Sequence, residues 1–278
     1  ISGDGDDSFT VRPAAGDASR IEITRSDLAS TYSAPRSLIT SLVFDGNDRP
    51  GVMLAGSAQT YLNRYGVKVG NRAVIVTSHD SAWHTAFDLA DAGVMVAAIV
   101  DTRADVAPEL LDAAKAKGIE TLTGYTVTGT KGRLRVSAVR VNSVRDGKIG
   151  FGRMIFCDAL LMCGGWTPCL HLFSHTKGTL HWDEEAQVFL PGHKAEACFI
   201  AGAGRGLWGI GNALNDGAKA GAEAARAAGF TAEPSTHAVA HDRTGRGVTH
   251  KELPTDRSPG KAKAFIDFQN DVTAKDIR

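Results

Sequence analysis

Residues 72–101, RAVIVTSHDSAWHTAFDLADAGVMVAAIVD, decide the fold of this 278-residue chain. Residues 72–77 form an apolar run typical of a buried strand, residues 81–92 carry apolar side chains at helical spacing, and residues 94–100 form a second apolar run. Gly93 stands where a glycine commonly ends a helix. The order predicts a βαβ unit, and the second run is typical of a parallel strand covered on both faces.

Weaker patterns predict the remaining elements. Short alternating runs near the start indicate a β-meander, and the pair Asp146-Gly147 favours a tight hairpin turn between two long alternating strands. Elsewhere, helical spacing predicts helices and β-branched or apolar runs predict strands. We expect helices at residues 52–65 and 106–117 and from Gly206 to Gly229, and strands at residues 8–12, 21–24, 119–123, 133–144, 148–156, 159–162 and 197–201.

These patterns divide the chain into five parts. A first outer segment with the meander precedes a nested Rossmann domain, a second outer segment follows, and a polar stretch of linker composition leads to the start of a further helical module. The predicted boundaries are 1–45, 46–157, 158–230, 231–263 and 264–278. Because the chain opens on a polar stretch and closes at a helix start, we expect it to be an excerpt of a longer polypeptide.

Composition limits the partners and the chemistry. Lys and Arg total 31 and Asp and Glu total 31, so no net charge attracts nucleic acid or an anionic membrane. No apolar run approaches the roughly 20 residues of a membrane span, and residues 1–7 are acidic and glycine-rich, unlike an export signal, so a cytoplasmic protein is expected. The four cysteines match neither zinc-ligand nor CxxC spacing, which predicts reduced thiols. No catalytic residue or metal ligand is predicted.

The turn inside residues 72–101 departs from a dinucleotide-binding turn. Such turns use three glycines for tight turning, close approach of pyrophosphate and helix packing, and here Thr77, His79 and Ala82 stand in their places. Asp101 lies at the end of the second strand, where a carboxylate would meet a ribose hydroxyl. A fold that has lost its ligand is favoured over a weakened nucleotide site, and Asp80 can serve as a helix cap.

A second glycine-rich turn, GAGRG at residues 202–206, precedes the last long helix, and its glycines are intact. A turn of this kind points a helix N-terminus at an anionic ligand. The alternative is a tight turn with close helix packing through Gly209, Gly211 and Gly217.

The order of elements resembles the pyridine nucleotide-disulfide reductase family, which nests a nicotinamide domain inside a flavin domain. The chain keeps the family's Asp80-Ser81-Ala82, but it has Gly202-Ala203 in place of a Gly-Asp pair and no redox CxxC, so disulfide reduction is not implied. The resemblance implies an α/β, FAD/NAD(P)-binding, glutathione-reductase-like fold of two dinucleotide domains, with a nested Rossmann βαβ domain and a β-meander. The first βαβ of the outer domain is expected to be absent.

Three longer strings are similar to the alpha subunits of heterotetrameric sarcosine oxidases: NDRPGV at residues 47–52, YLNRYGV at 61–67 and DFQNDVT at 267–273. This resemblance implies an alpha subunit that holds NAD where reductases hold the adenine half of FAD. It also implies beta, gamma and delta partner subunits, FAD and FMN elsewhere in the complex, and a following tetrahydrofolate-binding domain. The residues implied to lie along NAD are Gly164, Gly165, Trp166, Gly202, Ala203, Gly206, Trp208 and Ile210.

The resemblance therefore predicts an oxidoreductase component that holds NAD but does not carry the catalytic flavin. The complex would demethylate sarcosine to glycine with release of hydrogen peroxide and pass the one-carbon unit to tetrahydrofolate. Two alternatives stay open at this point: a structural or assembly module with vestigial nucleotide sites, and an NAD(P)H-dependent flavin oxidoreductase.

Overall fold

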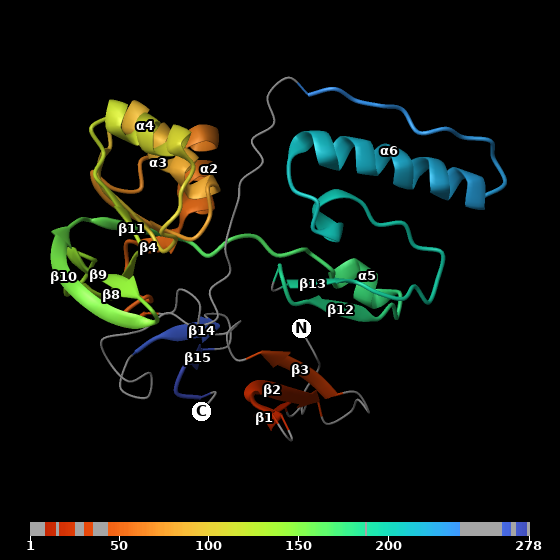
Figure 1. Cartoon of the computed structure of the whole chain (residues 1–278), viewed down its shortest axis with the longest axis horizontal. Coiled ribbons are helices and arrows are strands. Elements are labelled where there is room, and N and C mark those ends of the chain that lie inside the picture. Colours follow the sequence, from red (N-terminus) through yellow and green to blue (C-terminus); the bar gives the residue numbers. More distant parts are fainter. Residues whose placement is uncertain are drawn as a thin grey trace. The chain divides into compact units, whose positions relative to one another are not determined.

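The structure of the protein, a computed structural model, divides into two units (Figure 1). It describes residues 44–239 apart from residue 187, residues 263–267 and 271–276, and the strands at residues 9–14, 17–25 and 31–35. Unit 1 comprises residues 1–164 and 249–278, and unit 2 comprises residues 165–248. Within the described part of the chain, no helix is long and apolar enough to cross a membrane.

Unit 1 is built on a five-stranded parallel sheet in the order β4-β11-β5-β6-β7. Its strands are β4 (Val52–Leu54), β5 (Arg72–Thr77), β6 (Met95–Asp101), β7 (Thr121–Thr123) and β11 (Ala159–Cys163). Helix α3 (Ser81–Asp91) connects β5 to β6, and α4 (Pro108–Ala116) connects β6 to β7. The predicted βαβ unit and the α/β class of the fold are confirmed.

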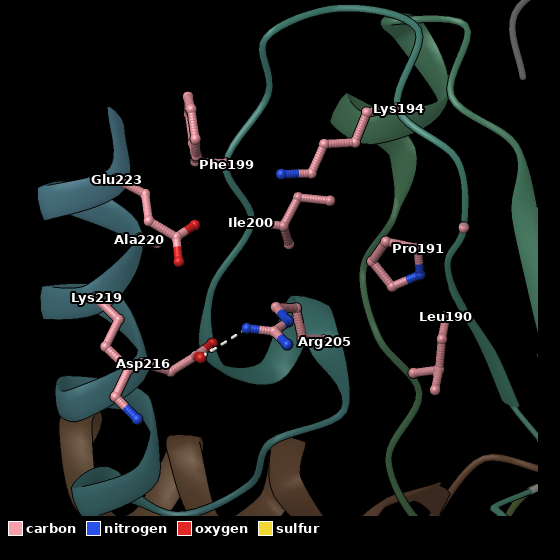
Figure 2. A pocket seen from close by; sticks show the side chains of 11 residues that line it. Leu190, Pro191, Lys194, Phe199, Ile200, Arg205, Asp216, Lys219, Ala220 and Glu223 are labelled. Atoms are coloured by element: carbon pink, nitrogen blue, oxygen red, sulfur yellow. Dashed lines mark hydrogen bonds and ion pairs between the residues drawn. The ribbon is translucent and has the colours of Figure 1, made fainter. Parts of the chain in front are cut away.

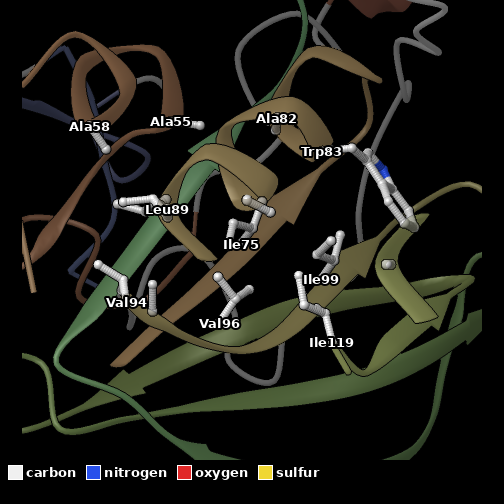
Figure 3. Packing of buried hydrophobic residues seen from close by; sticks show 14 of the residues in the cluster. Ala55, Ala58, Ile75, Ala82, Trp83, Leu89, Val94, Val96, Ile99 and Ile119 are labelled. Carbon is white, nitrogen blue, oxygen red and sulfur yellow. The ribbon is translucent and has the colours of Figure 1, made fainter. Parts of the chain in front are cut away.

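Both faces of this parallel sheet are covered. Ile75 and Leu161 belong to a core cluster that includes side chains of α2 (Ala55–Tyr65), α3 and α4 (Figure 3). Val74 and Leu160 belong to a second cluster on the other face. Successive side chains of a strand point to opposite faces, so β5, β6 and β11 each supply side chains to both clusters. This burial on both faces explains the continuous apolar runs in the sequence.

The second face packs against a three-stranded antiparallel sheet in the order β10-β9-β8. Its strands are β8 (Tyr125–Lys131), β9 (Ala138–Arg145) and β10 (Lys148–Phe156). Asp146 and Gly147 join the last two strands with φ values of 50° and 70°. Positive φ at both central residues is what a type I′ hairpin turn requires, so the predicted hairpin is confirmed. Strand β8 was not predicted.

A separate antiparallel sheet lies early in the chain, in the order β1-β2-β3. It consists of β1 (Phe9–Ala14), β2 (Asp17–Arg25) and β3 (Thr31–Pro35). The predicted meander is therefore confirmed, with a third strand added.

The end of the chain corrects the predicted helical module at residues 264–278. Its described residues form two antiparallel strands, β14 (Phe265–Asp267) and β15 (Val272–Thr273). The side chain of Asn47 donates a hydrogen bond to the carbonyl of Phe265 (2.7 Å) and accepts one from its N–H (2.9 Å). These long-range contacts hold an extended backbone and outweigh the local helical pattern.

Two predicted boundaries also change. The helix predicted for residues 52–65 begins at Ala55, because the preceding residues pair with β11 as the edge strand β4. The boundary between residues 157 and 158 falls too early, because β11 lies inside the sheet of unit 1, between β4 and β5. In the predicted linker, residues 231–239 form neither helix nor strand, and residues 240–262 lie outside the described residues.

Unit 2 contains a β-hairpin and one long helix. The hairpin is formed by β12 (Leu180–Asp183) and β13 (Val188–Pro191), preceded by α5 (His171–His175). A 3-10 turn, η1 (Gly202–Arg205), leads to α6 (Ile210–Ala227).

The strand predicted at residues 197–201 is not formed. Ala201 has extended dihedral angles, φ −139° and ψ 161°, but no described strand pairs with this segment. A strand is defined by hydrogen bonds to a neighbour, so extended backbone alone is insufficient.

Candidate nucleotide-binding sites

The turn between β5 and α3 bonds to itself and to the neighbouring strand. The hydroxyl of Thr77 accepts a hydrogen bond from the N–H of His79 (2.9 Å) and donates one to the carbonyl of His79 (2.7 Å). The N–H of Ser78 donates to the carbonyl of Cys163 (3.1 Å), and the N–H of Ser81 donates to Nδ1 of His79 (3.1 Å). Three backbone N–H groups of the turn are therefore bonded within the protein.

Asp101, at the end of β6, is fully buried and accepts four hydrogen bonds. Its Oδ1 accepts from the backbone N–H of Arg103 (2.9 Å) and from Nε of Arg103 (3.0 Å). Its Oδ2 accepts from Nη2 of Arg103 (2.7 Å) and from Nε1 of Trp83 (2.8 Å). The remaining side of the guanidinium faces Asp80, with Nη1 2.7 Å from Oδ1.

Sequence reasoning singled out Asp80 and Asp101 but missed the arginine between them. Arg103 is 7% exposed, and both carboxylates reach it because Asp101, at the end of β6, is paired with Thr77, at the end of β5 just before the turn that carries Asp80. The sequence signal that could have revealed this ion pair was Arg103 itself, an arginine two residues after Asp101 at the end of a predicted strand.

Two pKa shifts describe the charge of this region. Burial lowers the pKa of His79 below its ordinary value, and because Nδ1 accepts from Ser81, the proton of the neutral ring lies on Nε2. Burial also lowers the pKa of Arg103, but hydrogen bonds to Asp101 and Asp80 and their charges raise it overall. The guanidinium stays charged, so two carboxylates and one guanidinium leave one negative charge.

The second glycine-rich turn, in unit 2, forms as predicted before α6. Gly202, Gly206 and Gly209 have φ values of 59°, 74° and 94°, which L side chains rarely adopt. A Cβ on Gly202 would also lie 3.2 Å from the Cβ of Ala213. Glycine is therefore needed both for the turn and for its close approach to the helix.

Asp216 of α6 fixes this turn, and sequence reasoning missed it. The residue is 8% exposed, and its Oδ2 accepts a hydrogen bond from the N–H of Gly202 (2.9 Å). Its Oδ1 lies 2.8 Å from Nη1 of Arg205. A carboxylate inside an Ala- and Gly-rich helix was the only signal in the sequence.

Two tryptophans predicted to lie along NAD approach each other in unit 2. The ring centroids of Trp166 and Trp208 are 6.3 Å apart at an interplanar angle of 45°. Trp166 is 53% exposed, and Ile210, at the first turn of α6, is 62% exposed. One continuous turn and helix start carries Gly202, Ala203, Gly206, Trp208 and Ile210. Gly165 belongs to unit 2 as well, whereas Gly164 is the last residue of the first segment of unit 1.

A separate pocket of about 400 Å³ is lined by α6 and by the segments around β13 and η1 (Figure 2). Lys194, Arg205 and Glu223 contribute charged groups to it, and Arg205 is paired with Asp216. The ammonium group of Lys194 lies 4.8 Å from the centre of the Phe199 ring. None of the predicted cofactor residues lines this pocket. The spacing of residues 216, 219, 220 and 223 along one helix face was the signal available for it.

The four cysteines are free, with Cys157 buried and Cys169 exposed. Burial raises the pKa of the Cys157 thiol to about 12, so it is not a nucleophile at neutral pH. Among the described residues, no group of three or more His, Cys, Asp or Glu side chains is arranged to hold a metal ion.

Unit 1 thus defines an α/β protein built on a nested βαβ unit. The chain is similar over 85% of its length to sarcosine oxidase alpha subunits, with 36% identity over 242 residues to that of Corynebacterium sp. strain P-1 and 38% over 237 residues to that of Rhizobium meliloti. It is therefore a relative of a segment of the sarcosine oxidase alpha subunit, as the sequence strings predict. The chain spans about a quarter of the length of these relatives, 25% and 23%.

Solved structures give weaker likenesses. Lactococcus lactis thioredoxin reductase has a TM-score of 0.49 and 16% identity, covering 75% of this chain and 70% of that one. T. acidophilum thioredoxin reductase has a TM-score of 0.47 and 15% identity, covering 80% and 74%. These TM-scores are too low to support a conclusion about ligand or activity. No protein-family model matches the chain.

Proposed function

We propose that the chain is part of a cytoplasmic sarcosine-oxidising complex, as an NAD-holding segment of its alpha subunit. The observation that carries this proposal is the 36–38% identity over 85% of the chain to proteins named sarcosine oxidase subunit alpha. In the proposed complex, a flavin on the beta subunit oxidises sarcosine to glycine, and hydrogen peroxide is released. The gamma and delta subunits, the FMN and the transfer of the one-carbon unit to tetrahydrofolate belong to the same proposal.

The NAD site is proposed in unit 2. The first turn of α6 carries partial positive charge that would favour a phosphate, and the rings of Trp166 and Trp208 offer flat apolar surfaces. Gly165, Trp166, Gly202, Ala203, Gly206, Trp208 and Ile210 would hold the dinucleotide, and Gly164 remains a prediction. A bound NAD supplies a nicotinamide ring capable of hydride exchange, although the proposed oxidation takes place at the partner's flavin.

For the nested βαβ unit, the internal bonding of its turn favours a structural or assembly role. An NAD(P)H-dependent flavin oxidoreductase would need a nicotinamide site there, and the bonded N–H groups and the saturated Asp101 count against it.

The test is isolation of the intact complex through a tag on the full-length alpha subunit. Cofactors released by denaturation are identified by mass spectrometry, and sarcosine-dependent oxygen uptake and peroxide are measured. We expect NAD, flavin and sarcosine oxidation. A complex that oxidises sarcosine but contains no NAD would contradict the NAD role alone, and one that leaves sarcosine unoxidised would contradict the oxidase role.

Two tryptophan variants sharpen this test. Trp208→Ala should lower the NAD content of the complex. Trp182→Ala is the matched control, because its ring packs on Phe189 within the β12–β13 hairpin at a centroid distance of 4.9 Å and should leave the NAD content unchanged. Equal NAD content in both variants would argue against the proposed site.

A further inference from the structure

The nested βαβ unit presents both positions that a dinucleotide-binding fold uses for its ligand. In such folds, N–H groups at the strand-to-helix turn take the pyrophosphate, and a carboxylate at the end of the next strand takes the ribose hydroxyls. Here those positions are residues 77–81 and Asp101, brought together because Thr77 and Asp101 are paired in the register of β5 and β6.

The carboxylate of Asp101 has no capacity left to accept a further hydrogen bond. A carboxylate offers about four lone-pair sites. Asp101 uses four, for three donors of Arg103 and one of Trp83, at distances of 2.7 to 3.0 Å. A ribose hydroxyl could bind only by displacing one of these buried donors, which would then be left without a partner.

The turn is closed to a phosphate in the same way. The N–H groups of Ser78, His79 and Ser81 already donate to acceptors of the protein. The side chain of His79 occupies a glycine position and is 8% exposed. The neighbouring carboxylates and guanidinium of Asp80, Asp101 and Arg103 leave one negative charge, which opposes the entry of a pyrophosphate.

We propose that Arg103 acts as a built-in substitute for a nucleotide, its guanidinium bridging the turn before α3 and the end of β6, so that the nested domain is folded and closed without any dinucleotide. Arg103 is a positioning residue: it joins Asp80 to Asp101 across two segments that a bound nucleotide would otherwise join. This assignment is independent of the NAD site proposed in unit 2.

The first test compares two arginine variants of the full chain by urea unfolding. Arg103→Ala leaves two buried carboxylates without their cation, and the equilibrium constant for unfolding should rise roughly a hundredfold to several thousandfold. Arg153→Ala is the matched control, because its pair with Glu120 is 43% and 47% exposed, and its effect should stay below about fivefold. Millimolar methylguanidinium should restore part of the stability of Arg103→Ala and leave Arg153→Ala unchanged.

The second test uses the unmodified chain, so it does not depend on how the variant folds. Amide hydrogen exchange of residues 77–83 is measured by mass spectrometry with and without NAD, NADH, NADP and NADPH. We expect no change at this turn. Slowed exchange there with any of these nucleotides would overturn the proposal, as would an Arg103→Ala variant that is as stable as Arg153→Ala.

Discussion

Replacing Asp216 by alanine should loosen the glycine-rich turn of unit 2. The buried carboxylate accepts a hydrogen bond from the N–H of Gly202 at 2.9 Å, and a bond to a charged acceptor contributes about 1.5–3 kcal/mol. Its ion pair with Arg205 adds only about 0–1 kcal/mol, because the arginine side chain is 53% exposed. The expected loss in the free energy of unfolding of unit 2 is therefore about 1.5–4 kcal/mol.

Urea unfolding of the full chain, followed by tryptophan fluorescence, measures this loss. Three of the four tryptophans, Trp166, Trp182 and Trp208, lie in unit 2 and report its transition. Arg205→Ala is the control and should cost about 1 kcal/mol at most, since it removes only the exposed pair. Equal costs for the two variants, or no cost for Asp216→Ala, would refute the role given to this carboxylate.

Three further predictions concern other parts of the chain. Because burial lowers the pKa of His79, the unfolded chain takes up a proton on acidification that the folded chain does not. The free energy of unfolding should therefore fall as the pH drops below about 6.5, and it should fall less in His79→Gln. Urea titrations at several pH values measure this difference. Iodoacetamide should modify the exposed Cys169 of the native chain well before the buried Cys157, and mass spectrometry of native Cys157 carrying the label would contradict its burial. Asn47→Ala removes two hydrogen bonds to the backbone of Phe265, so it should weaken the attachment of β14 by about 1–3 kcal/mol and speed the amide exchange of this strand. Asn63→Ala, at an exposed position, is the control and should leave the amide exchange of β14 unchanged.

Elements that depend on local pattern could be predicted from the sequence. In the unit β5-α3-β6, both strands are continuous apolar runs in the sequence, and the helix ends just before Gly93, whose φ is 79°. The hairpin turn at Asp146 and Gly147 follows from backbone preferences of two residues.

Elements that depend on distant partners could not be predicted. Strand β8 forms because β9 lies beside it, and the extended C-terminal segment is held by Asn47, 218 residues away from Phe265. Conversely, residues 197–201 have a strand-like sequence, but no described strand pairs with them.

The sites show the same division. The glycines of the second turn were visible in the sequence because their conformation is a local requirement. The residues that hold the two turns, Asp216 and Arg103, could not be assigned, because each acts through contacts with residues that only the fold brings close. The absence of glycines at Thr77 and His79 did indicate that the nested turn had changed, but not what had replaced its ligand.

In the proposed arrangement, unit 2 holds NAD and the nested βαβ unit is closed to it. Photocrosslinking of the intact complex with an azido-adenine analogue of NAD, followed by peptide mapping, tests both parts at once. We expect label on peptides from residues 165–214 of unit 2, and competing NAD should reduce it. Competable label on residues 77–83 or 101–106 of the nested unit, with none in unit 2, would contradict it.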